Sequence, residues 1–97
     1  MGQQIEIESS TVVDDSVIVT TNRSLTGADG EGYSSSELAS DGSTFGAKLA
    51  TDLFESDGGI NRVYIASNVV VIQRVRQWKP KAIASASDVI KDFFLYY

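Results

Sequence analysis

Residues 60–75, which read INRVYIASNVVVIQRV, decide the fold of this chain. Two runs rich in β-branched residues flank the pair Ser67-Asn68, and a two-residue connection of this kind is typical of a β-hairpin. If Ala66 pairs with Val69 across the turn, one face of the hairpin is purely apolar. That face carries Val63, Ile65, Val70 and Ile72. We expect it to pack against helices.

The opposite face of this hairpin has a mixed composition. It carries Arg62, Tyr64, Val69, Val71, Gln73 and Val75, and Arg76 and Trp78 follow closely. Aromatic residues and arginine are enriched at binding hot spots, and an apolar row without a covering layer indicates a binding surface. We therefore predict a protein-binding surface made of Arg62, Tyr64, Val69, Val71, Val75, Arg76 and Trp78. Two alternatives stay open: a turn that differs by one residue would exchange the two faces, and the N-terminal segment or residues 22–42 could cover this one.

Two amphipathic helices flank the hairpin in the sequence. Residues 44–56 form the first, which Ser43 can cap. Its apolar face carries Phe45, Leu49 and Leu53. Gly58-Gly59 should end it, because glycine adopts the left-handed conformation of a helix C-cap at little cost. Pro80 suits the first turn of the second helix. The apolar face of that helix carries Ile83, Ala86, Ile90, Phe93, Phe94 and Tyr97.

The N-terminal residues predict two more strands. Residues 3–8 alternate between polar and apolar side chains and place Ile5 and Ile7 on an inner face. Residues 16–21 are β-branched and follow the turn-forming pair Asp14-Asp15. Because few residues separate these two strands, we expect them to pair antiparallel.

Residues 22–42 are rich in Gly and Ser, which predicts a flexible loop with a short strand near residues 33–36. The expected order of elements is β-β-(β)-α-β-β-α. Because hairpins dominate this order, the sequence predicts a single α+β domain over residues 1–97. We expect a two-layer sandwich with a largely antiparallel sheet and two helices on one face.

The sequence contains neither cysteine nor histidine. Disulfides, thiolate metal sites, thiol nucleophiles and imidazole bases are therefore excluded. The carboxylates Asp52, Glu55 and Asp57 cluster near the end of the first helix, but their polar neighbours favour a solvated face over an acid–base pair. We predict that the protein is not an enzyme and has no catalytic residue, cofactor or metal.

The net charge of −5 is unevenly divided. Residues 1–57 carry 11 acidic and 2 basic side chains, a net of −9, whereas residues 58–97 carry 2 acidic and 6 basic ones, a net of +4. One interpretation is that the two halves neutralise each other on folding. The other is a basic surface that meets an acidic partner. Its residues would be Arg62, Arg74, Arg76, Lys79 and Lys81.

The partner is expected to be a protein. An acidic chain disfavours nucleic acid, yet basic and aromatic side chains on a sheet keep single-stranded RNA as a second candidate ligand. Residues 1–10 lack the basic and apolar regions of a signal peptide, and no apolar run approaches the roughly 20 residues that a membrane span needs. We expect a cytoplasmic monomer that does not contact membranes.

The second half of the chain contains a distinctive order of motifs. It runs Leu53-Phe54-Glu55, Gly58-Gly59-Ile60, Val63-Tyr64-Ile65, Val69-Val70-Val71-Ile72, Trp78-Lys79-Pro80 and Val89-Ile90-Lys91-Asp92-Phe93-Phe94. This order resembles the N-terminal domain of Nfu/NifU-type iron–sulfur cluster scaffold proteins, where a similar helix, glycine turn, hairpin, Trp near Lys-Pro and closing helix follow one another. The resemblance implies a loop over residues 9–16, between the first two strands. That family usually has Thr-Pro-Asn-Pro-Asn-Ser there, whereas the segment contains no proline and no asparagine here.

The resemblance implies a stand-alone relative of that domain. In full-length family members a second domain carries the Cys-x-x-Cys motif that ligates the cluster, and these residues contain no such motif. The resemblance therefore implies an accessory module of iron–sulfur protein maturation that binds no cluster itself and docks an iron–sulfur assembly component.

Overall fold

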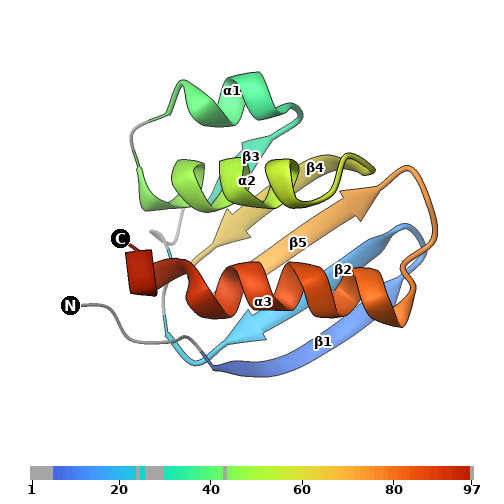
Figure 1. Cartoon of the computed structure of the whole chain (residues 1–97). Coiled ribbons are helices and arrows are strands. Elements are labelled where there is room, and N and C mark those ends of the chain that lie inside the picture. Colours follow the sequence, from blue (N-terminus) through green and yellow to red (C-terminus); the bar gives the residue numbers. More distant parts are fainter. Residues whose placement is uncertain (1–5, 24, 26–29, 43, 97) are drawn as a thin grey trace.

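The computed structural model describes residues 6–23, 25, 30–42 and 44–96, with side chains up to Phe93. The strands are β1 (Ile7–Val13), β2 (Ser16–Thr21), β3 (Glu31–Tyr33), β4 (Ile60–Ala66) and β5 (Val69–Arg74). The helices are α1 (Ser36–Ser40), α2 (Phe45–Ser56) and α3 (Pro80–Tyr96). The strands form one sheet in the order β1-β2-β5-β4-β3, and every neighbouring pair is antiparallel (Figure 1).

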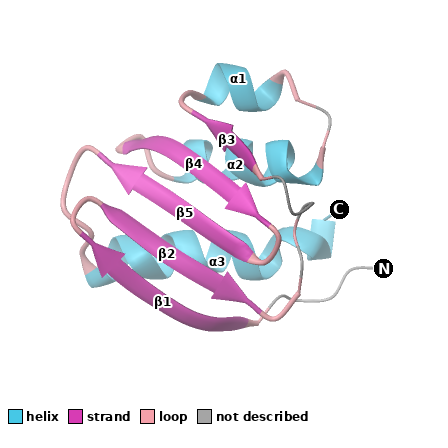
Figure 2. Ribbon diagram, turned by 180° about the vertical axis from the view of Figure 1, so that it is seen from behind, coloured by secondary structure: helices cyan, strands magenta, loops and turns pink. Residues whose placement is uncertain are grey.

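The helices α2 and α3 lie side by side on one face of this sheet, and α1 packs against α2 and β3 (Figure 1). From behind, the strands lie in front of the helices (Figure 2). The predicted α+β sandwich with an antiparallel sheet is thus confirmed. The short helix α1 is an addition to the two helices that were expected.

The hairpin of β4 and β5 forms as the sequence predicts. Ala66 pairs with Val69, and Ser67 has a φ of 55°, which suits a tight two-residue turn. The inner face is completely buried, and it carries Val63, Ile65, Val70 and Ile72. Opposite these residues, the helices contribute Leu49, Leu53, Ile90 and Phe93 to the same core. Each such side chain stabilises the fold by roughly 1.5–3 kcal/mol through burial.

Two hairpins, β1–β2 and β4–β5, join along β2 and β5 to make the sheet. Thr21 and Asn68 fix this junction, although 47 residues separate them in the sequence. The Thr21 amide donates to the Asn68 carbonyl oxygen at 2.9 Å, and the Asn68 side-chain amide donates to the Thr21 carbonyl oxygen at 3.0 Å. The Thr21 hydroxyl lies 2.8 Å from the carbonyl oxygen of Arg23 and 3.1 Å from that of Asn68. Thr21 is fully buried, so these bonds satisfy a polar group inside the core.

The first strand is longer and later than expected. The sequence pattern predicts a strand over residues 3–8 and a loop over residues 9–16, but β1 continues to Val13. The pair Asp14-Asp15 forms the whole connection to β2, because Asp14 adopts a φ of 53° and Val13 can then pair with Ser16. The prediction of a loop over residues 9–16 is therefore wrong for most of its length. Ile5 lies outside the described residues.

The Gly- and Ser-rich segment of residues 22–42 contains two short elements. The predicted strand near residues 33–36 is shifted, because β3 ends at Tyr33. Ser35 then caps α1, with its hydroxyl accepting a hydrogen bond from the Leu38 amide at 3.2 Å. Residues 24 and 26–29 of this segment lie outside the description.

The ends of α2 differ from the prediction. Thr44 is the N-cap, since its hydroxyl accepts a hydrogen bond from the Ala47 amide at 3.0 Å, and Ser43 lies outside the described residues. At the other end, neither Gly58 nor Gly59 has a positive φ. Asp57 ends the helix instead, because its carboxylate accepts a hydrogen bond from the Gly59 amide at 2.8 Å.

The apolar face of α2 departs from the prediction at its first residue, Phe45. Leu49 and Leu53 are completely buried, whereas Phe45 is half-exposed. The Phe45 ring meets the Phe93 ring edge to face, with 6.4 Å between their centroids. Phe45 therefore borders the core rather than filling it.

Candidate protein-binding surface

The face of the sheet opposite the helices is built from three rows of side chains. Residues that are direct partners in an antiparallel sheet share a face, so the register assigns each row. The central row crosses all five strands and consists of Thr11, Ile18, Val71, Tyr64 and Gly32. The rows on either side consist of Ser9, Thr20, Val69 and Ala66, and of Val13, Ser16, Gln73 and Arg62. We call these three rows the open face (Figure 2).

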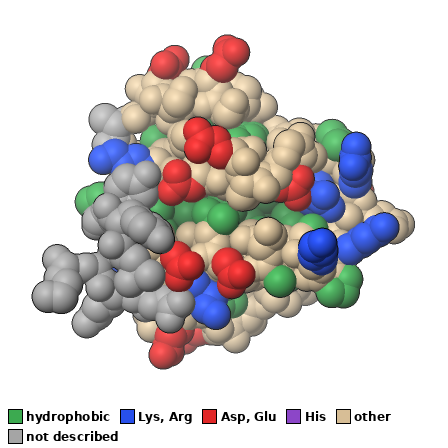
Figure 3. Space-filling view, in the orientation of Figure 1, with side chains coloured by type: hydrophobic (Ala, Val, Ile, Leu, Met, Phe, Trp, Pro, Cys, Tyr) green, Lys and Arg blue, Asp and Glu red, His purple; other side chains and the backbone are tan. Residues whose placement is uncertain are grey.

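The open face has a different charge from the rest of the molecule. Arg62 is the one charged side chain among the residues of the three rows, and none of them is acidic, although the chain carries a net charge of −5. Several acidic side chains lie on the helical side of the molecule instead (Figure 3). A partner can bury a sheet face of Val, Ile, Thr and Tyr without the free-energy cost of desolvating several charged side chains.

Tyr64 is the largest side chain on the open face and is 41% exposed. Its ring lies against the edge strand, where Gly30 and Gly32 leave room for it. A methyl group added at Gly32 would lie 3.2 Å from the Cδ2 atom of Tyr64, and one added at Gly30 would overlap its hydroxyl group. Gly30 also has a φ of +79°, a conformation that favours glycine. Tyr64 therefore packs against the edge strand in the space that these two glycines leave.

The other predicted surface residues fall into two groups. Val69 and Val71 lie on the open face and are half-buried by their neighbours in the sheet, while Arg62 is exposed at its border. Val75 and Arg76 lie beyond the end of β5, and both are exposed. The structure thus brings Arg62, Tyr64, Val69 and Val71 together, with Val75 and Arg76 beyond the strand end.

Trp78 does not belong to this surface, and the prediction that it does is wrong. Its side chain is only 8% exposed and belongs to the hydrophobic core. The indole Nε1 donates a hydrogen bond to the carbonyl oxygen of Asp15 at 2.8 Å, and the guanidinium of Arg74 lies 5.2 Å from the ring centroid. The chain leaves the line of β5 after Arg74, so the alternation of the strand no longer applies at residue 78.

The predicted basic surface is also smaller than the sequence indicates. Arg74 is largely buried and contacts Asp57 twice. Its Nε lies 2.9 Å from Oδ2, at an angle that makes this a charge contact, and its Nη2 donates a hydrogen bond to Oδ1 at 3.5 Å. Its terminal nitrogen donates to the Gln77 carbonyl oxygen at 2.7 Å. The pair of Arg74 and Asp57 joins the basic and acidic halves of the chain. The exposed members are Arg62, Arg76, Lys79 and Lys81, and basic side chains gather where α3 begins (Figure 3).

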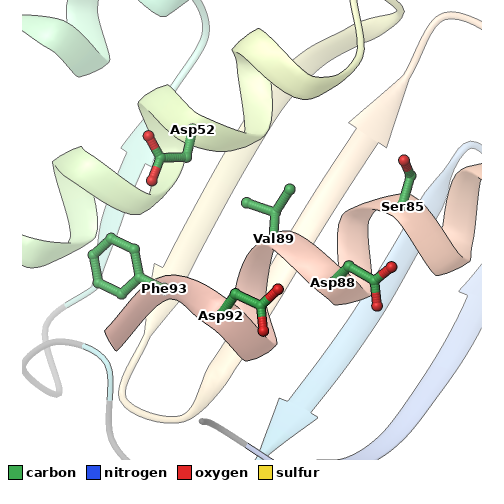
Figure 4. A pocket seen from close by; sticks show the side chains of 6 residues that line it. All are labelled: Asp52, Ser85, Asp88, Val89, Asp92 and Phe93. Carbon is green, nitrogen blue, oxygen red and sulfur yellow. The ribbon is translucent and has the colours of Figure 1, made fainter. Parts of the chain in front are cut away.

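A groove of about 390 Å³ runs between α2 and α3 (Figure 4). It is lined by Asp52, Ser85, Asp88, Val89, Asp92 and Phe93. Asp52 comes from α2, and the other residues come from α3, where Asp88 and Asp92 are four positions apart (Figure 4).

In the described part of the chain, no group of three carboxylates is arranged to hold a metal ion. The predicted carboxylate cluster is dispersed, since Glu55 is exposed and Asp57 faces Arg74.

The inner side of β3 carries a polar cluster next to the start of α2. The Tyr33 hydroxyl donates to Oε1 of Glu31 at 2.7 Å, and the Thr44 hydroxyl donates to the same oxygen. Gly46 leaves space for this carboxylate, because a methyl group there would lie 2.8 Å from it. Burial, followed by the hydrogen bond to Glu31, raises the pKa of Tyr33 above its ordinary value. The cluster attaches the edge strand to the cap of α2.

The predicted surface lacked several residues that belong to the open face or to the groove. Ile18 could have been included, because it lies in a predicted strand and alternates with the buried Val17 and Val19. Thr11 and Val13 were hidden by the prediction of a loop. Asp88 and Asp92 were detectable as a helical pair, but their position next to Asp52 depends on how the two helices pack.

The fold and the open face together define a small α+β sandwich with an antiparallel sheet that helices cover on one side. Comparison with models of protein families gives no match, and comparison with curated proteins gives none. A crystal structure of protein SAV1430 from Staphylococcus aureus, a structural-genomics target, has the same fold with a TM-score of 0.64. The two chains are 10% identical, and the alignment covers 87% of this chain and 96% of the other. At this identity the likeness establishes the fold alone.

In the described part of the chain, no helix is long and apolar enough to cross a membrane.

Proposed function

We propose that this chain is a non-catalytic protein-interaction module that binds a protein partner through the open face. The observation that carries this proposal is the combination of a nearly uncharged sheet face and a large aromatic side chain that packs on it beside two glycines. Interfaces are depleted of charge at their centre and enriched in Tyr and Arg. Tyr64 would be the central anchor, with Arg62 at the border.

We further propose that the partner is a component of iron–sulfur protein maturation. The support for this partner class is the order of motifs in the second half of the chain, which resembles the N-terminal domain of Nfu/NifU-type scaffolds. The chain would act by docking, with no cluster of its own, because it offers no cysteine or histidine ligand. In this role it would be a cytoplasmic monomer when the partner is absent.

The first experiment is a binding measurement with purified iron–sulfur assembly proteins. Isotope-labelled protein should show amide shifts in β2, β4 and β5 on addition of the correct partner. Tyr64→Ala should weaken this binding by at least about tenfold, because it removes a well-packed aromatic anchor. Leu38→Ala is the matched control, since Leu38 is an exposed apolar residue on α1. If a folded Tyr64→Ala variant binds as the unmodified protein does, the open face is not the binding surface.

A second candidate function is binding of single-stranded RNA on the same face. Its support is the position of Arg62 in the row next to Tyr64, since arginine and aromatic side chains on a sheet can contact phosphate and stack on bases. Binding of this kind weakens steeply as salt is added. A fluorescent single-stranded oligonucleotide that shows no affinity at low salt would exclude it.

A further inference from the structure

The strand β1 leaves one side of the sheet open to a further strand. It pairs with β2 alone among the described strands, and residues 8–13 are all exposed (Figures 1 and 2). In an edge strand, every second residue directs its N–H and C=O groups away from the neighbouring strand. The opposite edge is different, because β3 has only three residues and is followed at once by α1.

Residues 9–13, Ser-Ser-Thr-Val-Val, lack the features that usually protect an edge. They contain no lysine and no proline, and their register with β2 is continuous, since the irregularity lies between Ile7 and Ser9. Val12 and Val13 are 46% and 48% exposed and point to opposite faces of the sheet. A strand added beside β1 would therefore cover apolar surface on both faces.

The edge is also anchored at its C-terminal end. The carbonyl oxygen of Asp15 accepts two hydrogen bonds, one from the Trp78 indole at 2.8 Å and one from the Arg74 amide at 3.0 Å. These bonds fix the turn between β1 and β2 to the segment before α3. An edge that is already ordered loses little conformational entropy when a partner strand pairs with it.

Charge decides which kind of strand fits this edge. Glu6 and Glu8 precede the apolar stretch, Asp14 and Asp15 follow it, and all four are exposed. A second copy of β1 in antiparallel orientation would bring the acidic end of one strand to the opposite acidic end of the other. A parallel copy would bring identical acidic ends together. Like charges on facing strands repel, so self-pairing is opposed, whereas basic residues at both ends of a strand would be attracted.

We propose that β1 is a docking edge that takes up an extended segment of a partner protein as a sixth strand. The segment has small or β-branched residues opposite Ser9–Val13 and a Lys or Arg at each end. This inference rests on the proposed protein-binding function and specifies the partner's chemistry. It uses backbone hydrogen bonds at the sheet edge, which is a recognised mode of peptide binding.

The test uses the peptide Lys-Lys-Thr-Val-Thr-Val-Thr-Lys-Lys, blocked at both ends, and a control peptide with Glu in place of each Lys. The basic peptide should bind, shift the amides of residues 9–13 and slow their hydrogen exchange. The acidic peptide should not bind. Glu8→Lys combined with Asp15→Lys should weaken binding of the basic peptide by at least about tenfold, because two attractive contacts become repulsive. Asp88→Asn is the matched control, since Asp88 lines the groove between the helices and should not matter.

Proline substitutions test the backbone hydrogen bonds. Because consecutive residues point their N–H groups to opposite sides, one of Ser10→Pro and Thr11→Pro removes an outward N–H and the other breaks the pairing with β2. The variant whose thermal unfolding midpoint equals that of the unmodified protein should no longer bind the basic peptide. Unchanged binding by that variant, or shifts that map to the groove or to β4 and β5 instead of to residues 9–13, would overturn the docking edge. So would a dimer of the unmodified chain in sedimentation that the tolerated proline variant no longer forms, because a second copy would then occupy β1.

The two proposals fail separately. If Tyr64→Ala abolishes capture of an iron–sulfur assembly protein and the tolerated proline variant does not, the open face binds and the edge proposal is wrong. If the proline variant abolishes capture and Tyr64→Ala does not, the edge binds and the open-face proposal is wrong.

Discussion

The indole Nε1 of Trp78 donates a hydrogen bond to the backbone carbonyl oxygen of Asp15 across 63 residues of sequence. This bond fastens the turn between β1 and β2 to the segment that leads into α3. It places a polar ring atom at the border of the core, where an indole nitrogen needs a partner. The edge strand β1 is held in position by this contact at one end.

Trp78→Phe should lower the free energy of unfolding by about 1–2 kcal/mol. The change removes the hydrogen bond and part of the buried ring, but Asp15 keeps its second donor, the Arg74 amide, so no acceptor is left without a partner. Urea unfolding at pH 7 measures the effect. An unchanged unfolding midpoint would contradict the structural role of the indole. The affinity for the partner should stay unchanged, because Trp78 does not lie on the open face.

Gly32→Ala should destabilise the protein by about 1 kcal/mol, because the added methyl group pushes against the ring of Tyr64. In a Tyr64→Ala background the same change should cost less, since the obstacle is gone, and the difference is the coupling energy of a double-mutant cycle. Gly58→Ala is the matched control. Nothing lies within 4 Å of a methyl group at that position and its φ is not positive, so its stability should hardly change.

Asp57→Ala should lower the free energy of unfolding by about 1–3 kcal/mol. The carboxylate accepts a hydrogen bond from the Gly59 amide and faces the largely buried guanidinium of Arg74. Asp57→Asn separates these two roles, because the amide oxygen can still accept from Gly59 while the charge is lost. If Asn and Ala cost the same, the charge contact dominates. Glu55→Ala, at an exposed position of α2, is the control and should be nearly neutral.

The stability of the protein should fall with pH above the ordinary pKa of tyrosine, about 10. Folding raises the pKa of Tyr33, so in this range the unfolded chain has lost a proton that the folded chain still holds. The contribution is complete below the unfolded pKa and disappears as the pH passes the folded one. Urea unfolding of the protein and of Tyr33→Phe between pH 8 and pH 11 should therefore show a difference that shrinks with pH. A constant difference would exclude this origin.

The sequence was most informative where burial imposes a regular pattern. Val63, Ile65, Val70 and Ile72 alternate because one face of the central hairpin must enter the core, and the Ser67-Asn68 turn fixes their register. The same physics made most of the apolar face of α3 predictable, since Ile90 must face the sheet. The protein-binding surface could be predicted in part for the same reason, because it is the other side of this hairpin.

The features that were missed do not depend on such a pattern. An exposed edge strand such as β1 needs no alternation, so Ser9–Val13 reads as a loop. The five residues of α1 form because Ser35 caps them and Ala39 is buried, which local propensity alone does not specify. The burial of Trp78 depends on its distant partner Asp15, and the chain direction after β5 is set by tertiary contacts.

The junction between Thr21 and Asn68 has a consequence for how the chain folds. Each hairpin pairs residues that are close in sequence and can close within microseconds, whereas the strand pair that unites them must first bring together segments 47 residues apart. We expect this encounter to set the folding rate. A substitution at Thr21 would then slow the acquisition of the native state, while a change at Asp14, in the tip of the β1–β2 hairpin, would act chiefly on how fast it is lost.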